Sequence, residues 1–195
     1  MKNKIVLVGE SGVGKTSLVK RWTSHIFREN QSPTIGAAYT SVDYIYAGVN
    51  RQVQIWDTAG EEKYRSMAPI YSRGAYGALV VFDLTSRPTF LRIPEWIEVV
   101  DSARSMVIVI CGNKSDLEER REVSFEEASN FCQTNNYRYF ETSASNGSYV
   151  QEVFEEIVEA TFKNSEKELD VHVDDNNFKD LSGDGNKKGT LGGCC

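Results

Sequence analysis

The chain has 195 residues, 40% of them apolar and 11% aromatic, enough for one domain with a packed core. Its net charge of -6 argues against a nucleic-acid binder, because such proteins carry a basic surface. No apolar run approaches the roughly 20 residues of a transmembrane helix, and the N-terminus leads directly into a strand without the layout of a signal peptide.

The first part of the chain predicts three strands and one helix. An apolar run at 4–8 stops at a glycine, as a buried parallel strand does. A helix is expected at 15–23. Strands at 39–47 and 52–56 are separated by a short turn that contains Gly48, which predicts a hairpin.

The second part alternates three more strands with three helices. The strands are expected at 76–82, 107–111 and 137–141. The helices are expected at 89–103, after a capping box that begins at Ser124, and from Val150 to Phe162, where apolar residues repeat at helical spacing.

Strands that alternate with helices predict an α/β fold. We expect a mostly parallel six-stranded sheet, helices on both faces and one antiparallel edge strand. Residues 1–164 should form the domain, because 165–195 are rich in Asp, Asn and Gly and lack periodicity, which is typical of a flexible tail.

The stretch GESGVGKT at 9–16 matches the phosphate-binding pattern GxxxxGK[ST], between a strand and a helix. Its glycines let backbone N–H groups surround an anion. The predicted nucleotide-binding residues here are Ser11, Gly12, Val13, Gly14, Lys15, Thr16 and Ser17. Lys15 should reach the β- and γ-phosphates, and the Thr16 hydroxyl should bind Mg²⁺. A glycine-rich turn that binds nothing is the weaker alternative, because strand, Lys-Thr pair and helix all align. We therefore expect the α/β fold to be that of a P-loop NTPase.

The stretch GNKSD predicts recognition of guanine. The Asp116 carboxylate can accept hydrogen bonds from N1–H and the 2-amino group of guanine, and adenine offers neither donor. Asn113 should tie this loop to the P-loop, and the stem of Lys114 should cover one face of the base. Ser143 and Ala144 follow the last strand, where the Ala144 N–H can donate to guanine O6. By itself NKSD is equally an ordinary polar turn, and the P-loop upstream favours guanine.

Taken in order, GESGVGKT, PTIG, WDTAG, NKSD and ETSA resemble the Ras superfamily of small GTPases, from residue 3 to about residue 164. Ser11, the YSRGA stretch and the terminal cysteine pair are similar to Rab proteins, and PTIGAAY with MAPIYSRGA looks most like the endosomal branch. The resemblance implies a monomeric GTP/GDP switch in vesicle traffic. It also implies effectors, an exchange factor and a GTPase-activating protein. The alternatives are a nucleotide-gated binding module with little hydrolysis and an ATP-using enzyme, which NKSD opposes.

The resemblance also assigns roles to single residues. Phe27 would pack against guanine. Thr34 would complete the Mg²⁺ shell begun by Thr16, and Asp57 would hold the ion through a water. The Gly60 N–H would sense the γ-phosphate. The implied catalytic set is Lys15, Thr34, Gly60 and Glu61, and no arginine finger is evident in the chain, so a partner should supply one.

Two positions depart from the family's pattern. Glu61 replaces the usual glutamine, so it keeps an acceptor, loses the N–H₂ donor and adds a charge. With Glu62 beside it, we expect Glu61 to turn outward and to slow unaided hydrolysis, although a carboxylate can also act as a general base. Ser145 replaces the usual lysine, which removes a cationic stem from beside the base.

Two surfaces should meet partners. Tyr39, Trp56 and Tyr71 resemble the aromatic triad that Rab proteins present to effectors, and the alternative is that these rings, Trp56 above all, belong to the core. Cys194 and Cys195 resemble a doubly prenylated terminus, whose two lipids would anchor the protein to the cytoplasmic face of a membrane. A prenyl-binding chaperone would be needed in the cytosol.

Overall fold

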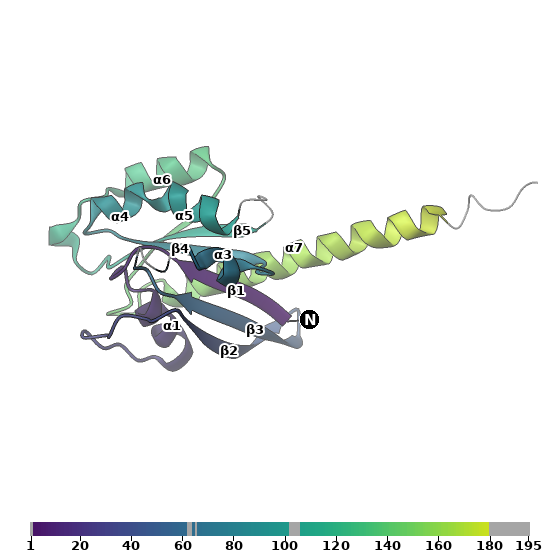
Figure 1. Ribbon diagram of the computed structural model, residues 1–195, viewed down its shortest axis with the longest axis horizontal. Coiled ribbons are helices and arrows are strands. Elements are labelled where there is room, and N and C mark those ends of the chain that lie inside the picture. Colours follow the sequence, from purple (N-terminus) through teal and green to yellow (C-terminus); the bar gives the residue numbers. More distant parts are fainter. Residues whose placement is uncertain (1, 62–63, 65, 102–105, 180–195) are drawn as a thin grey trace, which may run out of the picture.

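The computed structural model describes residues 2–61, 64, 66–101 and 106–179. Its strands form one sheet in the order β2-β3-β1-β4-β5-β6 (Figure 1). The strands are β1 (Lys2–Val8), β2 (Ala37–Tyr46), β3 (Val49–Thr58), β4 (Gly77–Asp83), β5 (Val107–Asn113) and β6 (Arg138–Thr142). All pairs are parallel except β2 with β3, which confirms the mostly parallel six-stranded sheet with one antiparallel edge strand.

The helices are α1 (Lys15–Ser24), α3 (Ala68–Ser72), α4 (Arg87–Leu91), α5 (Ile93–Val100), α6 (Phe125–Thr134) and α7 (Val150–Lys179), with a short 3₁₀ turn at Glu118–Arg120. Successive side chains of a strand point to opposite faces of the sheet. Accordingly, Ile5 and Leu7 pack into a core with α1 and α7, while Val6 and Val8 pack into a second core with α5 and α6. Helices therefore cover both faces, as predicted.

The structure corrects the helix predicted at 89–103. Two helices occupy its described part: α4 ends at Leu91, and α5 begins at Ile93. Pro94 is in the first turn of α5, a position that suits proline because the amide there needs no helical partner. Ser124 is confirmed as the N-cap of α6, since its hydroxyl accepts a hydrogen bond from the Glu127 N–H at 3.1 Å, while the Glu127 carboxylate accepts from the Arg87 guanidinium at 2.6 Å.

Helix α7 runs past residue 165, where the sequence predicts a flexible tail to begin, and its C-terminal half projects away from the sheet (Figure 1). The segment from Val150 to Lys179 contains neither Gly nor Pro, so an established helix can continue through it at little cost. A helix thus occupies the first part of the predicted tail, and the flexibility of residues 165–195 stays a prediction. Within the described residues, no helix combines the length and the apolarity needed to cross a bilayer.

Candidate functional site

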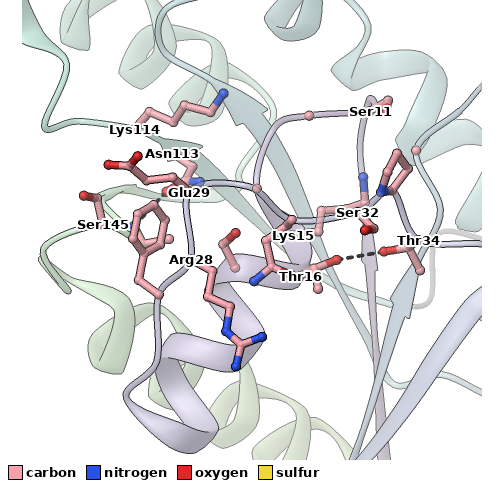
Figure 2. A pocket seen from close by; sticks show the side chains of 18 of the residues that line it. Ser11, Lys15, Thr16, Arg28, Glu29, Ser32, Thr34, Asn113, Lys114 and Ser145 are labelled. Atoms are coloured by element: carbon pink, nitrogen blue, oxygen red, sulfur yellow. Dashed lines mark hydrogen bonds between the residues drawn. The ribbon is translucent and has the colours of Figure 1, made fainter.

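A cavity of about 590 Å³ lies where β1, β3, β5 and β6 end. Figure 2 shows the P-loop side chains Lys15 and Thr16 with Thr34 on one side of it and Asn113, Lys114 and Ser145 on the other. The predicted residues that line it are Ser11, Gly12, Gly14, Lys15, Thr16, Ser17, Phe27, Thr34, Gly60, Glu61, Asn113, Lys114, Asp116 and Ala144. Three others, Val13, Asp57 and Ser143, instead hydrogen-bond to lining residues.

The P-loop holds Lys15 in a buried position. Its ammonium donates to the backbone carbonyls of Gly9 at 2.7 Å and Glu10 at 2.8 Å. Burial lowers the pKa of Lys15 to about 8, because the charged form loses its hydration, and the nearby carboxylates only partly oppose this. At Gly14, with φ of 100°, a Cβ would lie 2.3 Å from the Asn113 side-chain nitrogen, so glycine is required there. A buried cation beneath open backbone N–H groups is suited to a phosphate.

The pKa of Lys15 predicts how phosphate binding depends on pH. A bound phosphate favours the protonated amine, so binding should take up a proton wherever free Lys15 is partly neutral. With a pKa of about 8, the affinity for GDP should be about fourfold lower at pH 8.5 than at pH 7. Calorimetric titration at pH 8.5 in two buffers of different ionisation enthalpy measures the proton uptake directly. Zero uptake at that pH would contradict the prediction.

Two hydroxyls and a buried carboxylate form a second cluster beside Lys15. Thr16 Oγ1 donates to Asp57 Oδ2 at 2.6 Å and lies 2.8 Å from Thr34 Oγ1, a hydrogen bond in which either oxygen can be the donor (Figure 2). Burial raises the pKa of Asp57, and the Thr16 bond opposes this shift. Asp57 Oδ1 is buried without a hydrogen-bond partner among the described residues. These oxygens fit a small hard cation such as Mg²⁺, which prefers oxygen ligands.

The loop after β5 is fastened to the P-loop, as predicted. The Asn113 side-chain N–H₂ donates to the Val13 carbonyl at 2.8 Å, across 100 residues of sequence. Its oxygen accepts from the Ala144 N–H at 3.2 Å. The prediction treats that N–H as a donor for guanine O6, whereas the structure already gives it a partner. A guanine role for Ala144 therefore requires it to exchange or share this hydrogen bond.

Asp116 is held from the neighbouring loop. The Ser143 hydroxyl donates to Asp116 Oδ1 at 2.5 Å, which gives Ser143 an indirect role. Asp116 is exposed at the cavity rim, where an incoming base can reach it. Lys114 has a positive φ of 71° and pairs with Asp83 Oδ2 at 2.6 Å, which fixes the direction of its stem.

Residues 60 and 61 lie close to the P-loop. A Cβ on Gly60 would come within 2.4 Å of the Glu10 backbone and 2.5 Å of Lys15 Nζ, so only glycine fits. Glu61 lines the cavity, and its carbonyl accepts from the Tyr64 N–H at 2.9 Å in a turn that fixes its backbone. The backbone of Glu61 is thus held at the cavity, and the outward orientation of its side chain stays a prediction. Glu62, the other part of that expectation, lies outside the described residues.

The structure adds residues that the sequence interpretation does not include. Trp96 of α5 donates from its indole N–H to Glu10 Oε1 at 3.1 Å, which links this helix to the P-loop. Arg21 of α1 donates to the Ala144 carbonyl at 2.8 Å. The only sequence signal for the contact between Trp96 and Glu10 is the acidic residue inside the P-loop pattern. Nothing in the local sequence indicates the contact of Arg21 with Ala144.

The three aromatic residues of the predicted effector surface form one cluster. The ring of Trp56 lies 5.6 Å from that of Tyr39, edge to face, and 6.3 Å from that of Tyr71. Tyr39 is 51% exposed, and the neighbouring Ile35 and Ile70 are 81% and 67% exposed. Trp56 is half-buried and also packs against the second core, so it belongs to both the core and the surface.

Comparison with known proteins agrees with this geometry. The model of the Ras family matches residues 4–163. The chain is 41% identical over 168 residues to Ras-related protein Rab-25 of Oryctolagus cuniculus, an alignment that covers 85% of this chain and 79% of that relative. The chain belongs to the Rab proteins of the Ras family. This Rab is thus a small GTPase of vesicle traffic, and proteins of its family generally bind GTP or GDP with Mg²⁺.

Proposed function

We propose that this Rab is a switch that binds GTP and GDP through the residues of the cavity, hydrolyses GTP slowly when unaided, and recruits effectors to a membrane. One observation carries the proposal: residues suited to phosphate, to Mg²⁺ and to guanine border the same cavity. Lys15 would contact the phosphates, and Asp116 would select the base.

Single-turnover assays with radiolabelled GTP and ATP test the proposal. We expect GTP to be bound and slowly hydrolysed and ATP to be ignored. Equal use of ATP would contradict the guanine assignment. Tight binding of GTP without measurable hydrolysis, even with an activating protein, would instead identify a nucleotide-gated binding module. The glutamate at position 61 is the one feature that favours this second possibility.

The proposed chemistry depends on positioning and charge. Thr16, Thr34 and Asp57 would hold Mg²⁺, which when bound would neutralise phosphate charge. The Lys15 ammonium would stabilise the charge that develops on the transferred phosphoryl oxygens. The Gly60 N–H would contact the γ-phosphate, and Glu61 would accept a hydrogen bond from the attacking water.

Substitution Glu61→Gln should accelerate unaided hydrolysis by about tenfold. Glutamine restores an N–H₂ donor and removes a charge that repels the γ-phosphate by roughly 1 to 4 kcal/mol at 4 Å, between water-like and surface-like dielectric. A partner that inserts its own arginine and glutamine would make residue 61 dispensable, so native and variant rates should be about equal with an activating protein. Single-turnover rates with and without that protein measure both effects. Faster unaided hydrolysis by the native chain would show instead that the carboxylate acts as a base.

The remaining parts of the proposal concern partners. Tyr39, Trp56 and Tyr71 would form the effector surface, and an exchange factor and an activating protein would set the nucleotide state. The protein would act as a monomer. Two lipids on Cys194 and Cys195, which lie outside the described residues, would anchor it to the cytoplasmic face of an endosomal membrane, and a prenyl-binding chaperone would hold it in the cytosol.

Replacement of both Cys194 and Cys195 by serine should abolish membrane association, because even one lipid chain gives only marginal membrane binding and the variant carries none. Nucleotide binding should be unchanged. Fractionation of cells that express native and variant chains measures the membrane-bound share. Replacement of the buried Cys111 by serine provides a control for loss of a thiol elsewhere. Undiminished membrane association of the double variant would contradict the lipid anchor.

A further inference from the structure

Arg21 connects two loops that border the base end of the cavity. Its guanidinium donates from Nε to the Ala144 carbonyl at 2.8 Å and from Nη2 to the Ser145 carbonyl at 2.5 Å, both on the loop after β6. From Nη1 it donates to the His25 carbonyl at 3.1 Å, on the loop after α1. All three acceptors are backbone oxygens, so the arginine fixes the paths of both loops.

No other hydrogen bond joins residues 25–27 to residues 143–147 in the described part of the chain. The Phe27 ring, predicted to pack against guanine, lies 5.9 Å from the centre of the guanidinium. Arg21 is therefore the hydrogen-bonded link between the loop that carries Phe27 and the loop that carries Ala144, and it acts beside the apolar core to which Ala144 belongs and against which Phe27 packs.

The bond to the Ala144 carbonyl also orients the next amide. A trans peptide is planar, so the C=O of Ala144 and the N–H of Ser145 point in opposite directions. With the carbonyl directed at Arg21, the Ser145 N–H is directed away from it. That N–H has no hydrogen-bond partner among the described residues, and Ser145 lines the cavity.

We infer that Arg21 is a positioning residue for guanine recognition: it holds the Ala144–Ser145 amides and the Phe27 loop in place around the base. This inference rests on the proposed guanine binding. The rigid fork of arginine suits three simultaneous carbonyl contacts, which lysine cannot reproduce.

The test compares Arg21→Ala, Arg21→Lys and a control, Arg138→Ala, which removes an equally charged side chain paired with Glu156 at the far end of β6. Dissociation constants for GDP and for 6-thio-GDP are measured by displacement of mant-labelled GDP, together with melting temperatures. The two ligands differ only at base position 6, where sulfur is a weak acceptor.

We expect Arg21→Ala to weaken GDP binding about tenfold, Arg21→Lys about threefold and Arg138→Ala less than about twofold. The loss with 6-thio-GDP should be about threefold or less for Arg21→Ala, because the amides that Arg21 orients contribute little to that ligand. If Arg21→Ala loses the same affinity for GDP and for 6-thio-GDP, Arg21 has a merely structural role and the inference is overturned. A GDP affinity of Arg21→Ala equal to that of Arg138→Ala would overturn it too. If Arg21→Ala does not fold, Arg21→Lys is judged by the same comparison of ligands. A native chain that binds no GDP would overturn the proposed function itself.

Discussion

Substitution Asp116→Asn should lower the affinity for GTP by at least about a hundredfold and raise that for xanthosine triphosphate. The carboxylate accepts two hydrogen bonds from guanine, whereas an amide offers one acceptor and one donor group, which matches xanthine better. The Ser143 hydroxyl, 2.5 Å from Asp116 Oδ1, can donate to either side chain, so the loop should keep its conformation.

Competition between unlabelled nucleotides and mant-labelled GDP measures this exchange of preference. Substitution Ser143→Ala is the matched control, since it removes the hydroxyl that holds Asp116 but leaves the carboxylate. It should weaken GTP binding by less than about tenfold and leave the preference for guanine intact. Unchanged guanine preference in Asp116→Asn would mean that another residue selects the base.

Substitution Thr16→Asn should reduce the affinity for GTP in the presence of Mg²⁺ by at least about a hundredfold, and the affinity for GDP by less. The larger amide displaces the hydroxyl that lies 2.6 Å from Asp57 Oδ2 and 2.8 Å from Thr34 Oγ1. The buried Asp57 carboxylate then loses a hydrogen bond that favours its charged form. Because the third phosphate adds negative charge, the GTP complex depends more on the cation.

Nucleotide titrations with Mg²⁺ and with a chelator separate the effect of Thr16→Asn on Mg²⁺-dependent binding from its effect on the binding of the nucleotide alone. In the control variant Thr16→Ser the hydroxyl is kept, so near-native affinities are expected. Without Mg²⁺ the native and Thr16→Asn chains should differ much less. Normal GTP affinity and normal effector binding in Thr16→Asn would contradict the assignment of Thr16, Thr34 and Asp57 to Mg²⁺.

Most of the chemistry of the site could be predicted from short motifs. Lys15 and Thr16 belong to the eight-residue pattern GESGVGKT, and Asn113 and Asp116 belong to the five-residue stretch GNKSD. In each motif the residue types and spacing restrict the chemistry, and the flanking strand and helix fix the place of the loop in an α/β fold. Strand β4 could equally be predicted from the sequence, because its apolar run is nearly continuous. In the structure all seven of its residues are buried.

Other features are absent from any local stretch of sequence. The hydrogen bond from Arg21 to Ala144 spans 123 residues, and the one from Trp96 to Glu10 spans 86. The partner of the Ala144 N–H and the place of Glu61 in the cavity lining likewise depend on how the loops pack together. Hydrophobic periodicity contains no information about such polar contacts between distant segments.

The sequence by itself determined the fold class, the phosphate loop and the candidate residues for guanine and Mg²⁺, because each depends on residue types a few positions apart. The tertiary structure decided which backbone amides face the cavity, because the orientation of an N–H depends on the partner of the neighbouring carbonyl. For the Ala144–Ser145 peptide that partner is Arg21 of α1, which lies 123 residues before Ala144 in the chain and meets it only when the sheet assembles.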